Sequence, residues 1–177
     1  NRLFRDTSAW YHIVWKVDTT QGTAANRVKL YVNGVQETSF ATETYPPQNT
    51  NLRWNGTNAD DQGGITRIGA IQADTGSYDG YFSEFVFIDG TALDADSFGE
   101  FDSRSNIWKP IDVSGLTFGT NGFYMDFQGS STGQNVNGFG GDKSGSGNHF
   151  SSSGLSAVDT STDTCTNNFA TFNPLIR

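Results

Sequence analysis

The chain has 177 residues, of which 34% are hydrophobic and 14% aromatic, with 21 Gly and a net charge of −8. The length is sufficient for a domain with a hydrophobic core, and the many aromatic, Gly, Asn and Thr residues favour strands joined by turns. The eleven Lys and Arg are scattered, which argues against nucleic acid and anionic membranes as partners.

Two further classes are excluded by the sequence. Cys165 is the only cysteine, so the chain forms neither an intrachain disulfide nor a Cys-based zinc site. No stretch is long and apolar enough for membrane insertion as a helix. The start at Asn1, without Met and in mid-pattern, is compatible with a processed or partial segment of a longer protein.

The amino-terminal third predicts a β-hairpin. Residues 10–17 alternate with period two, typical of a strand with one deeply buried face, and Tyr11, Ile13, Trp15 and Val17 share a side. Residues 27–32 alternate in the same way. Asn33-Gly34 follows, a pair that tolerates the positive φ angles of a type I′ turn, and residues 35–40 form the returning strand.

The middle of the chain predicts a long loop, further strands and one short helical turn. Residues 41–64 lack periodicity and read as a surface loop, with a short strand near 52–54. Residues 93–101 are the helical candidate, with Asp94 as its cap. Further strands are predicted at 65–71, 80–88 and 122–127.

The amino-acid composition changes in the carboxy-terminal part of the chain. Residues 128–168 are mostly small and polar, but interspersed apolar residues indicate an ordered, loop-rich tail, namely Phe139, Phe150, Leu155 and Val158. We therefore divide the chain into an all-β unit over 1–113 and a second part over 114–177. The second part is expected to form a strand and a Gly/Ser-rich extension that completes the fold of the first or packs on a neighbour.

Long segments of the sequence resemble a known family. RDTSAWYHIVWKVDTT…NRVKLYVNGVQ (5–36) and YDGYFSEFVFIDGTALDADSFGEFD (78–102) look like paired strands of concanavalin A-like (laminin-G-like) domains. Together with GTNGFYMDF, DKSGSGN and DTCTNNFATFNPL, they are similar to a form common in structural proteins of tailed, especially marine, bacteriophages. The resemblance implies an all-β fold, an antiparallel sandwich with jelly-roll connections.

The resemblance also implies a function. It favours a virion structural or attachment module in a tail-fibre, tail accessory or capsid-decorating protein, located on the phage particle and assembling with other virion proteins or as a homo-oligomer. One feature departs from the family: its first strands, which precede the WYH hairpin, are missing. They lie upstream in a longer polypeptide, or residues 116–177 supply them, or DKSGSGN begins a second domain.

The carboxylates predict no enzyme. Concanavalin A-like glucanases pair acidic residues at alternate positions of one strand, because retaining glycoside hydrolysis needs two carboxylates about 5 Å apart. Glu84 has no acidic residue two or four positions away, so a glucan hydrolase is the third and most distant function considered.

Calcium is the metal that the resemblance allows, although we expect no cofactor to be required. Laminin-G-like domains often bind it through Asp and Asn side chains. The DKSGSGN resemblance points to Asp142, Ser144 and Asn148, with Asp126 as a helper. The alternative is a tight turn that needs no metal.

Aromatic residues in the expected loops lead to the second function considered, a secreted, extracellular adhesion domain that binds cell-surface glycans. The residues expected to stack on sugars are Tyr45, Trp54 and Tyr78, which lie in or beside loops. In an aromatic-rich sandwich, the alternative is that they fill gaps in the core or an interface.

The tail carries the predicted assembly anchors. Residues 128–177 are too polar for an independent core, so their apolar side chains need a surface to cover. We expect Phe150, Leu155, Phe169 and Phe172 to pack as anchors on the sandwich or on a neighbour. The alternative is a flexible tail on a monomer.

Overall fold

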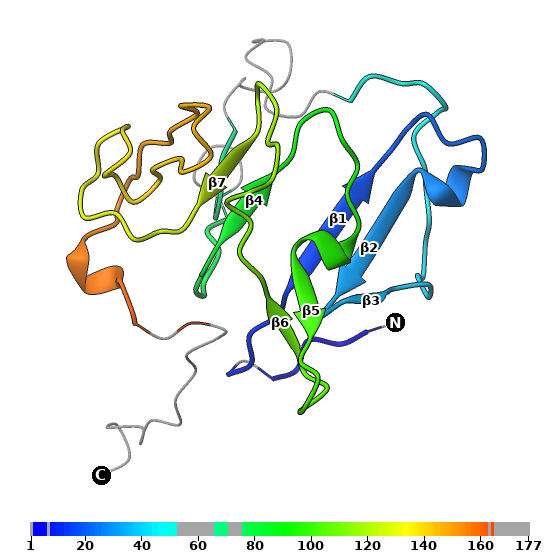
Figure 1. The fold of residues 1–177 in the computed structure, drawn as a ribbon, viewed down its shortest axis with the longest axis horizontal. Helices are drawn as coiled ribbons and strands as arrows, with labels where there is room; N and C mark the ends of the chain where they lie inside the picture. Colours follow the sequence, from blue (N-terminus) through cyan, green and yellow to red (C-terminus); the bar gives the residue numbers. More distant parts are fainter. Residues whose placement is uncertain (1, 7, 53–65, 71–75, 163, 165–177) are drawn as a thin grey trace.

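The computed structural model describes residues 2–6, 8–52, 66–70, 76–162 and 164. This part of the chain contains short strands and single 3-10 turns and no α-helix, which confirms the all-β prediction. Its strands form one three-stranded and two two-stranded antiparallel sheets, which are small and do not close on one another (Figure 1). None of the described helical turns could cross a membrane.

The first sheet contains the predicted hairpin and the predicted strand that precedes it. It consists of β1 (Ile13–Val17), β2 (Val28–Val32) and β3 (Val35–Gln36), in that order. Asn33 and Gly34 adopt φ angles of 49° and 77° between β2 and β3, so both have the positive φ that this turn type requires. The side-chain oxygen of Asn33 also accepts a 2.8 Å hydrogen bond from the His12 amide.

The strands are shorter than their sequence patterns predicted. β1 begins at Ile13 rather than residue 10, and β3 ends at Gln36 rather than residue 40. Alternation marks residues that suit a strand, whereas the observed ends are fixed by where a partner strand is available. Of the predicted strand 65–71, the described residues form an isolated bridge between Ala70 and Ser77.

The second sheet joins the middle of the chain to its last third. β4 (Phe85–Phe87) pairs with β7 (Phe123–Met125), within the strands predicted at 80–88 and 122–127. Residues after 116 therefore add a strand beside β4. The following loops, yellow to orange in Figure 1, lie beside β7, and a bridge between Met125 and Asp142 connects them to it.

The predicted helix is a single 3-10 turn, η3 (Ala95–Ser97), followed directly by β5 (Gly99–Phe101). Asp94 occupies the capping position but makes no side-chain cap. Its carboxylate instead accepts hydrogen bonds from Lys16 and Tyr31 of the first sheet, so a tertiary interaction replaces the local one.

β5 pairs with β6 (Trp108–Pro110) in the third sheet, and Trp108 connects this sheet to the first. A Cβ atom added to Gly34 would lie 2.2 Å from the Trp108 ring, and one added to Gly99 would lie 2.6 Å from it. The indole therefore fits between the β2–β3 turn and β5 only because both positions are glycine.

The buried apolar side chains of the described residues come from the first sheet and from the segment between residues 95 and 139. They concentrate around β7, where loop residues after 128 cover the strand. The buried hydrophobic residues are Val14, Val32, Ala95, Val113, Phe118, Phe123, Met125 and Phe139.

Candidate interaction surface

One side of the first sheet is apolar and partly uncovered. Ile13 lies opposite Val32 and Trp15 opposite Leu30, while Val32 also lies opposite Val35. Residues directly opposite one another in an antiparallel pair share a face, and so do alternate residues of a strand. We call this side the open face; its members are Ile13, Trp15, Val17, Val28, Leu30, Val32 and Val35.

The opposite side of the same sheet is packed. It carries Val14, which is buried, and two polar side chains that bind Asp94: Lys16 Nζ and Tyr31 Oη each donate to Asp94 Oδ1 at 2.9 Å. Burial, together with this hydrogen bond, raises the pKa of Tyr31 to about 12. The hydrogen bonds from Lys16 and Tyr31 lower the pKa of Asp94, so its carboxylate stays ionised beside Lys16.

Exposure distinguishes the open face from a core. Ile13 is 56% exposed and Val35 51% exposed, although both are strand residues with large apolar side chains. Val32, between them in the register, is 1% exposed. The face is therefore an apolar surface from which Ile13 and Val35 protrude on either side of the buried Val32.

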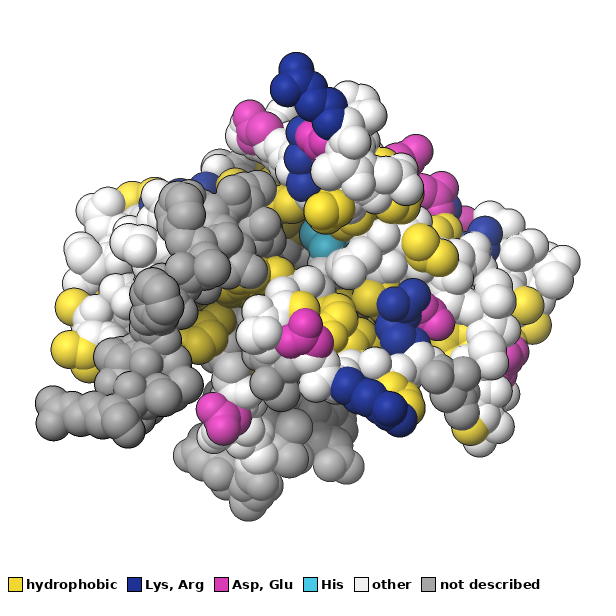
Figure 2. Space-filling model, turned by 90° about the horizontal axis from the view of Figure 1, so that it is seen from below, with side chains coloured by type: hydrophobic (Ala, Val, Ile, Leu, Met, Phe, Trp, Pro, Cys, Tyr) yellow, Lys and Arg dark blue, Asp and Glu magenta, His cyan; other side chains and the backbone are white. Residues whose placement is uncertain are grey.

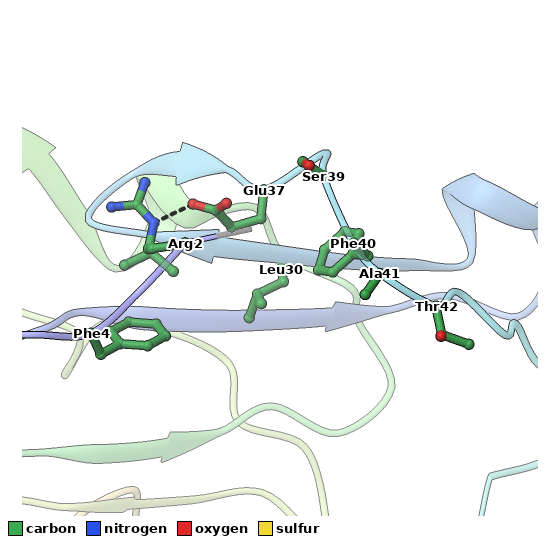
Figure 3. Close-up of a pocket in the computed structure, with 9 residues that line it drawn as sticks. Arg2, Phe4, Leu30, Glu37, Ser39, Phe40, Ala41 and Thr42 are labelled. Atoms are coloured by element: carbon green, nitrogen blue, oxygen red, sulfur yellow. Dashed lines mark hydrogen bonds and ion pairs between the residues drawn. The ribbon is translucent and has the colours of Figure 1, made fainter.

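A groove of about 360 Å³ runs along the open face (Figure 3). Leu30 and Val32 contribute to it from β2, and Phe4 and Phe40 flank it from the segments before β1 and after β3. The other lining residues are Arg2, Glu37, Ser39, Ala41 and Thr42. Phe4 is 52% exposed and Phe40 42% exposed, so aromatic rings border the hollow on both sides.

The charges that line the groove balance one another. Arg2 Nε donates to Glu37 Oε1 in an ion pair drawn in Figure 3, and these are the two charged residues among those that line it. The lining thus carries no net charge in a chain of net charge −8. Such a surface suits burial of apolar area against another surface better than chemistry on a substrate.

The residues predicted to bind sugars do not form one platform. Tyr45 is half-buried and donates a 2.6 Å hydrogen bond to Glu43. Tyr78 is exposed and stacks on Phe82, with ring centroids 4.6 Å apart. Trp54 lies outside the described residues.

The residues predicted to bind calcium are brought together around Asp142, but they bind one another and the backbone. Asp142 is 2% exposed, and its carboxylate accepts hydrogen bonds from the amides of Tyr124, Ser144 and Asn148 at 3.0, 2.8 and 2.9 Å. Burial alone would raise the pKa of Asp142, but these hydrogen bonds outweigh it and lower the pKa.

The side chains of Asn148 and Asp126 also form hydrogen bonds with the backbone. The Asn148 side-chain amide donates to the carbonyls of Thr120 and Gly122, and Asp126 accepts from the Gln128 amide. In the part of the chain that the structure describes, no group of three or more His, Cys, Asp or Glu residues is arranged to hold a metal ion. Calcium binding stays a prediction, and the visible role of Asp142 is to organise this loop.

Two of the four predicted anchors, Phe150 and Leu155, lie among the described residues. Phe150 packs edge-on against Phe123 of β7, with centroids 4.9 Å apart, and its amide bonds to the Gly140 carbonyl. Leu155 is exposed. Phe169 and Phe172 lie outside the described residues, so their role as anchors stays a prediction.

One arrangement was not visible in the sequence. Glu84 directly precedes β4 and Asp126 directly follows β7, so the pairing of Phe85 with Met125 brings both residues to the same end of the sheet. Desolvation by burial, together with repulsion by Asp126 and Asp112, raises the pKa of Glu84, and the hydrogen bond that Tyr124 donates to it offsets only part of this rise. A search for acids at alternate positions of one strand could not find this pair, because it depends on the pairing of β4 with β7.

Comparison with known proteins adds no family to this description. No protein-family model, no curated protein and no solved structure matches the chain.

Proposed function

We propose that this chain is a non-catalytic structural or attachment module of a virion, of the concanavalin A-like sandwich type, acting at the surface of a phage particle. Its partners are other virion proteins and further copies of itself. The family resemblance of residues 5–36 and 78–102 suggests the setting, and the open face carries the argument for assembly.

The open face supports assembly for an energetic reason. Exposed apolar surface costs roughly 25 cal/mol per Å² relative to buried surface. Monomeric proteins seldom expose a contiguous apolar patch larger than a few hundred Å², and larger patches usually mark interaction sites. A sheet face bordered by the exposed side chains of Phe4, Ile13, Val35 and Phe40 fits this description.

The experiment compares virions that carry the natural chain with virions that carry Ile13→Lys or Ile107→Lys. Both isoleucines are exposed, but Ile107 lies between β5 and β6, off the open face. Quantitative mass spectrometry should find the natural chain and Ile107→Lys in fixed proportion to the major capsid protein, and Ile13→Lys strongly depleted. Absence of the natural chain from purified virions would refute the proposal.

An extracellular carbohydrate-binding adhesion domain is the second candidate. It is favoured by the segment 78–82, where Tyr78, Tyr81 and Phe82 are all exposed, because exposed aromatic rings can stack on sugars. A glycan array tests it: binding that disappears in Tyr78→Ala would support this candidate, and no binding to any glycan would exclude it.

A further inference from the structure

We propose that the open face pairs with the open face of a second copy of this chain, so that two sheets pack face to face about a two-fold axis. This inference rests on the proposed role in assembly and names the partner and the surface. In such an arrangement the same patch is buried on both copies, as in most homodimers.

The exposed apolar area matches what such an interface requires. Standard interfaces bury about 800 Å² per partner, and about 65% of a homodimer interface is apolar, which gives about 500 Å². Half-exposed large side chains each present on the order of 100 Å², so Phe4, Ile13, Val35 and Phe40 supply about 400 Å². The remainder comes from partly exposed open-face residues, namely Val17, Val28 and Leu30.

The shape of the face suits another sheet. Its branched side chains stand in cross-strand rows, with Ile13 and Val35 raised on either side of the buried Val32. Sheets that pack face to face interdigitate such rows at a distance of about 10 Å, with strands within about 30° of one another. The ridges and the groove over Leu30 give one surface both the protrusions and the hollow that its own copy needs.

Charge favours a second copy at this place. Two copies of a chain with net charge −8 repel one another over most of their surfaces. The groove lining is an exception, because its only charged residues, Arg2 and Glu37, form an ion pair. Contact through the open face therefore buries apolar area without placing a net like charge at its centre.

The test is sedimentation equilibrium of the full chain and of four variants. Ile13→Lys and Val35→Lys place an ammonium group within the proposed interface, and Ile107→Lys and Val158→Lys make matched changes at side chains that are 66% and 90% exposed elsewhere. We expect a dimer for the natural chain and both controls, and a dissociation constant raised at least about 100-fold in Ile13→Lys and Val35→Lys. Their circular dichroism should match that of the natural chain, because these residues are already exposed in the monomer.

A natural chain that stays monomeric up to about 0.1 mM, or a dimer that the control substitutions weaken as much as Ile13→Lys does, would overturn the inference. A monomeric chain that nevertheless enters virions in fixed proportion would overturn the two-fold dimer alone. It would leave the proposed function standing with a different virion protein on the open face. A chain that dimerises as expected but is absent from virions would instead refute the proposed function alone.

Discussion

Asp142 holds the loop after β7 through three backbone amides, those of Tyr124, Ser144 and Asn148. Asp142→Ala leaves these donors without their acceptor, so we expect the free energy of unfolding to fall by about 3 kcal/mol and the melting temperature by roughly 6–12 °C. Asp142→Asn keeps one acceptor oxygen and should lose less. Thermal unfolding at pH 7 measures both.

The pH dependence follows from the lowered pKa of Asp142. The folded state favours the ionised carboxylate, so this stabilisation is present above the ordinary value of 3.8 and is lost as the pH falls through the lower folded value. The difference between the natural chain and Asp142→Ala should therefore shrink in acid. An unchanged difference at pH 2 would show that the carboxylate charge does not contribute.

The pKa shift of Glu84 has the opposite sign to that of Asp142. Its pKa is raised in the folded chain, so the ionised form that is present at pH 7 destabilises the fold. Desolvation of Glu84 is the main cause, and repulsion by Asp126 and Asp112 adds to it. Unfavourable charge interactions in a sheet cost roughly 0.2–1 kcal/mol, so Glu84→Gln should raise the melting temperature by about 1–3 °C at pH 7. The gain should vanish below the ordinary value of 4.5, where the carboxyl is protonated.

The matched control is Glu100→Gln in β5, which removes an exposed ion pair with Lys109. It should leave stability unchanged or slightly lower. Equal gains from both substitutions would mean that a reduced overall negative charge, rather than the local environment of Glu84, explains the effect.

At the scale of elements, the Trp108 ring fixes the third sheet against the β2–β3 turn. Gly34→Ala and Gly90→Ala both place a Cβ at a positive φ angle, 77° and 87°. At Gly90 that Cβ meets nothing within 4 Å, whereas at Gly34 it would lie 2.2 Å from Trp108. Urea unfolding should therefore show a loss of about 1 kcal/mol for Gly90→Ala and at least about 2 kcal/mol more for Gly34→Ala. Equal losses would contradict the packing of Trp108 on this turn.

Local patterns predicted the elements that depend on neighbouring residues. The pairing of β1 with β2, the Asn33-Gly34 turn between β2 and β3 and the centres of β4 and β7 follow from alternation and turn chemistry. The β5–β6 pair was not predicted, and the helical candidate shrank to one turn. Asp94 accepts a hydrogen bond from Lys16, 78 residues away, instead of capping a helix. Local sequence patterns do not reveal a partner at such a distance along the chain.

At the level of the whole molecule, the sequence could not predict where the candidate site lies. Composition was sufficient to predict an all-β chain, but both sides of β1 carry apolar residues, and alternation cannot say which side is covered. The side with Val14 and Lys16 is packed because η3 supplies Asp94 for Lys16. From below, hydrophobic side chains reach the surface at several places among charges of both signs (Figure 2). The open face is thus a property of the assembled sheets.

We expect the open face to be covered when this protein functions. Hydroxyl-radical footprinting of the native assembly and of the dissociated chain measures this, whichever partner is present. Phe4, Ile13 and Phe40 should be oxidised several-fold less in the assembly, while Ile107 and Val158 should react equally in both states. Equal oxidation of Phe4, Ile13 and Phe40 in the two states would contradict it.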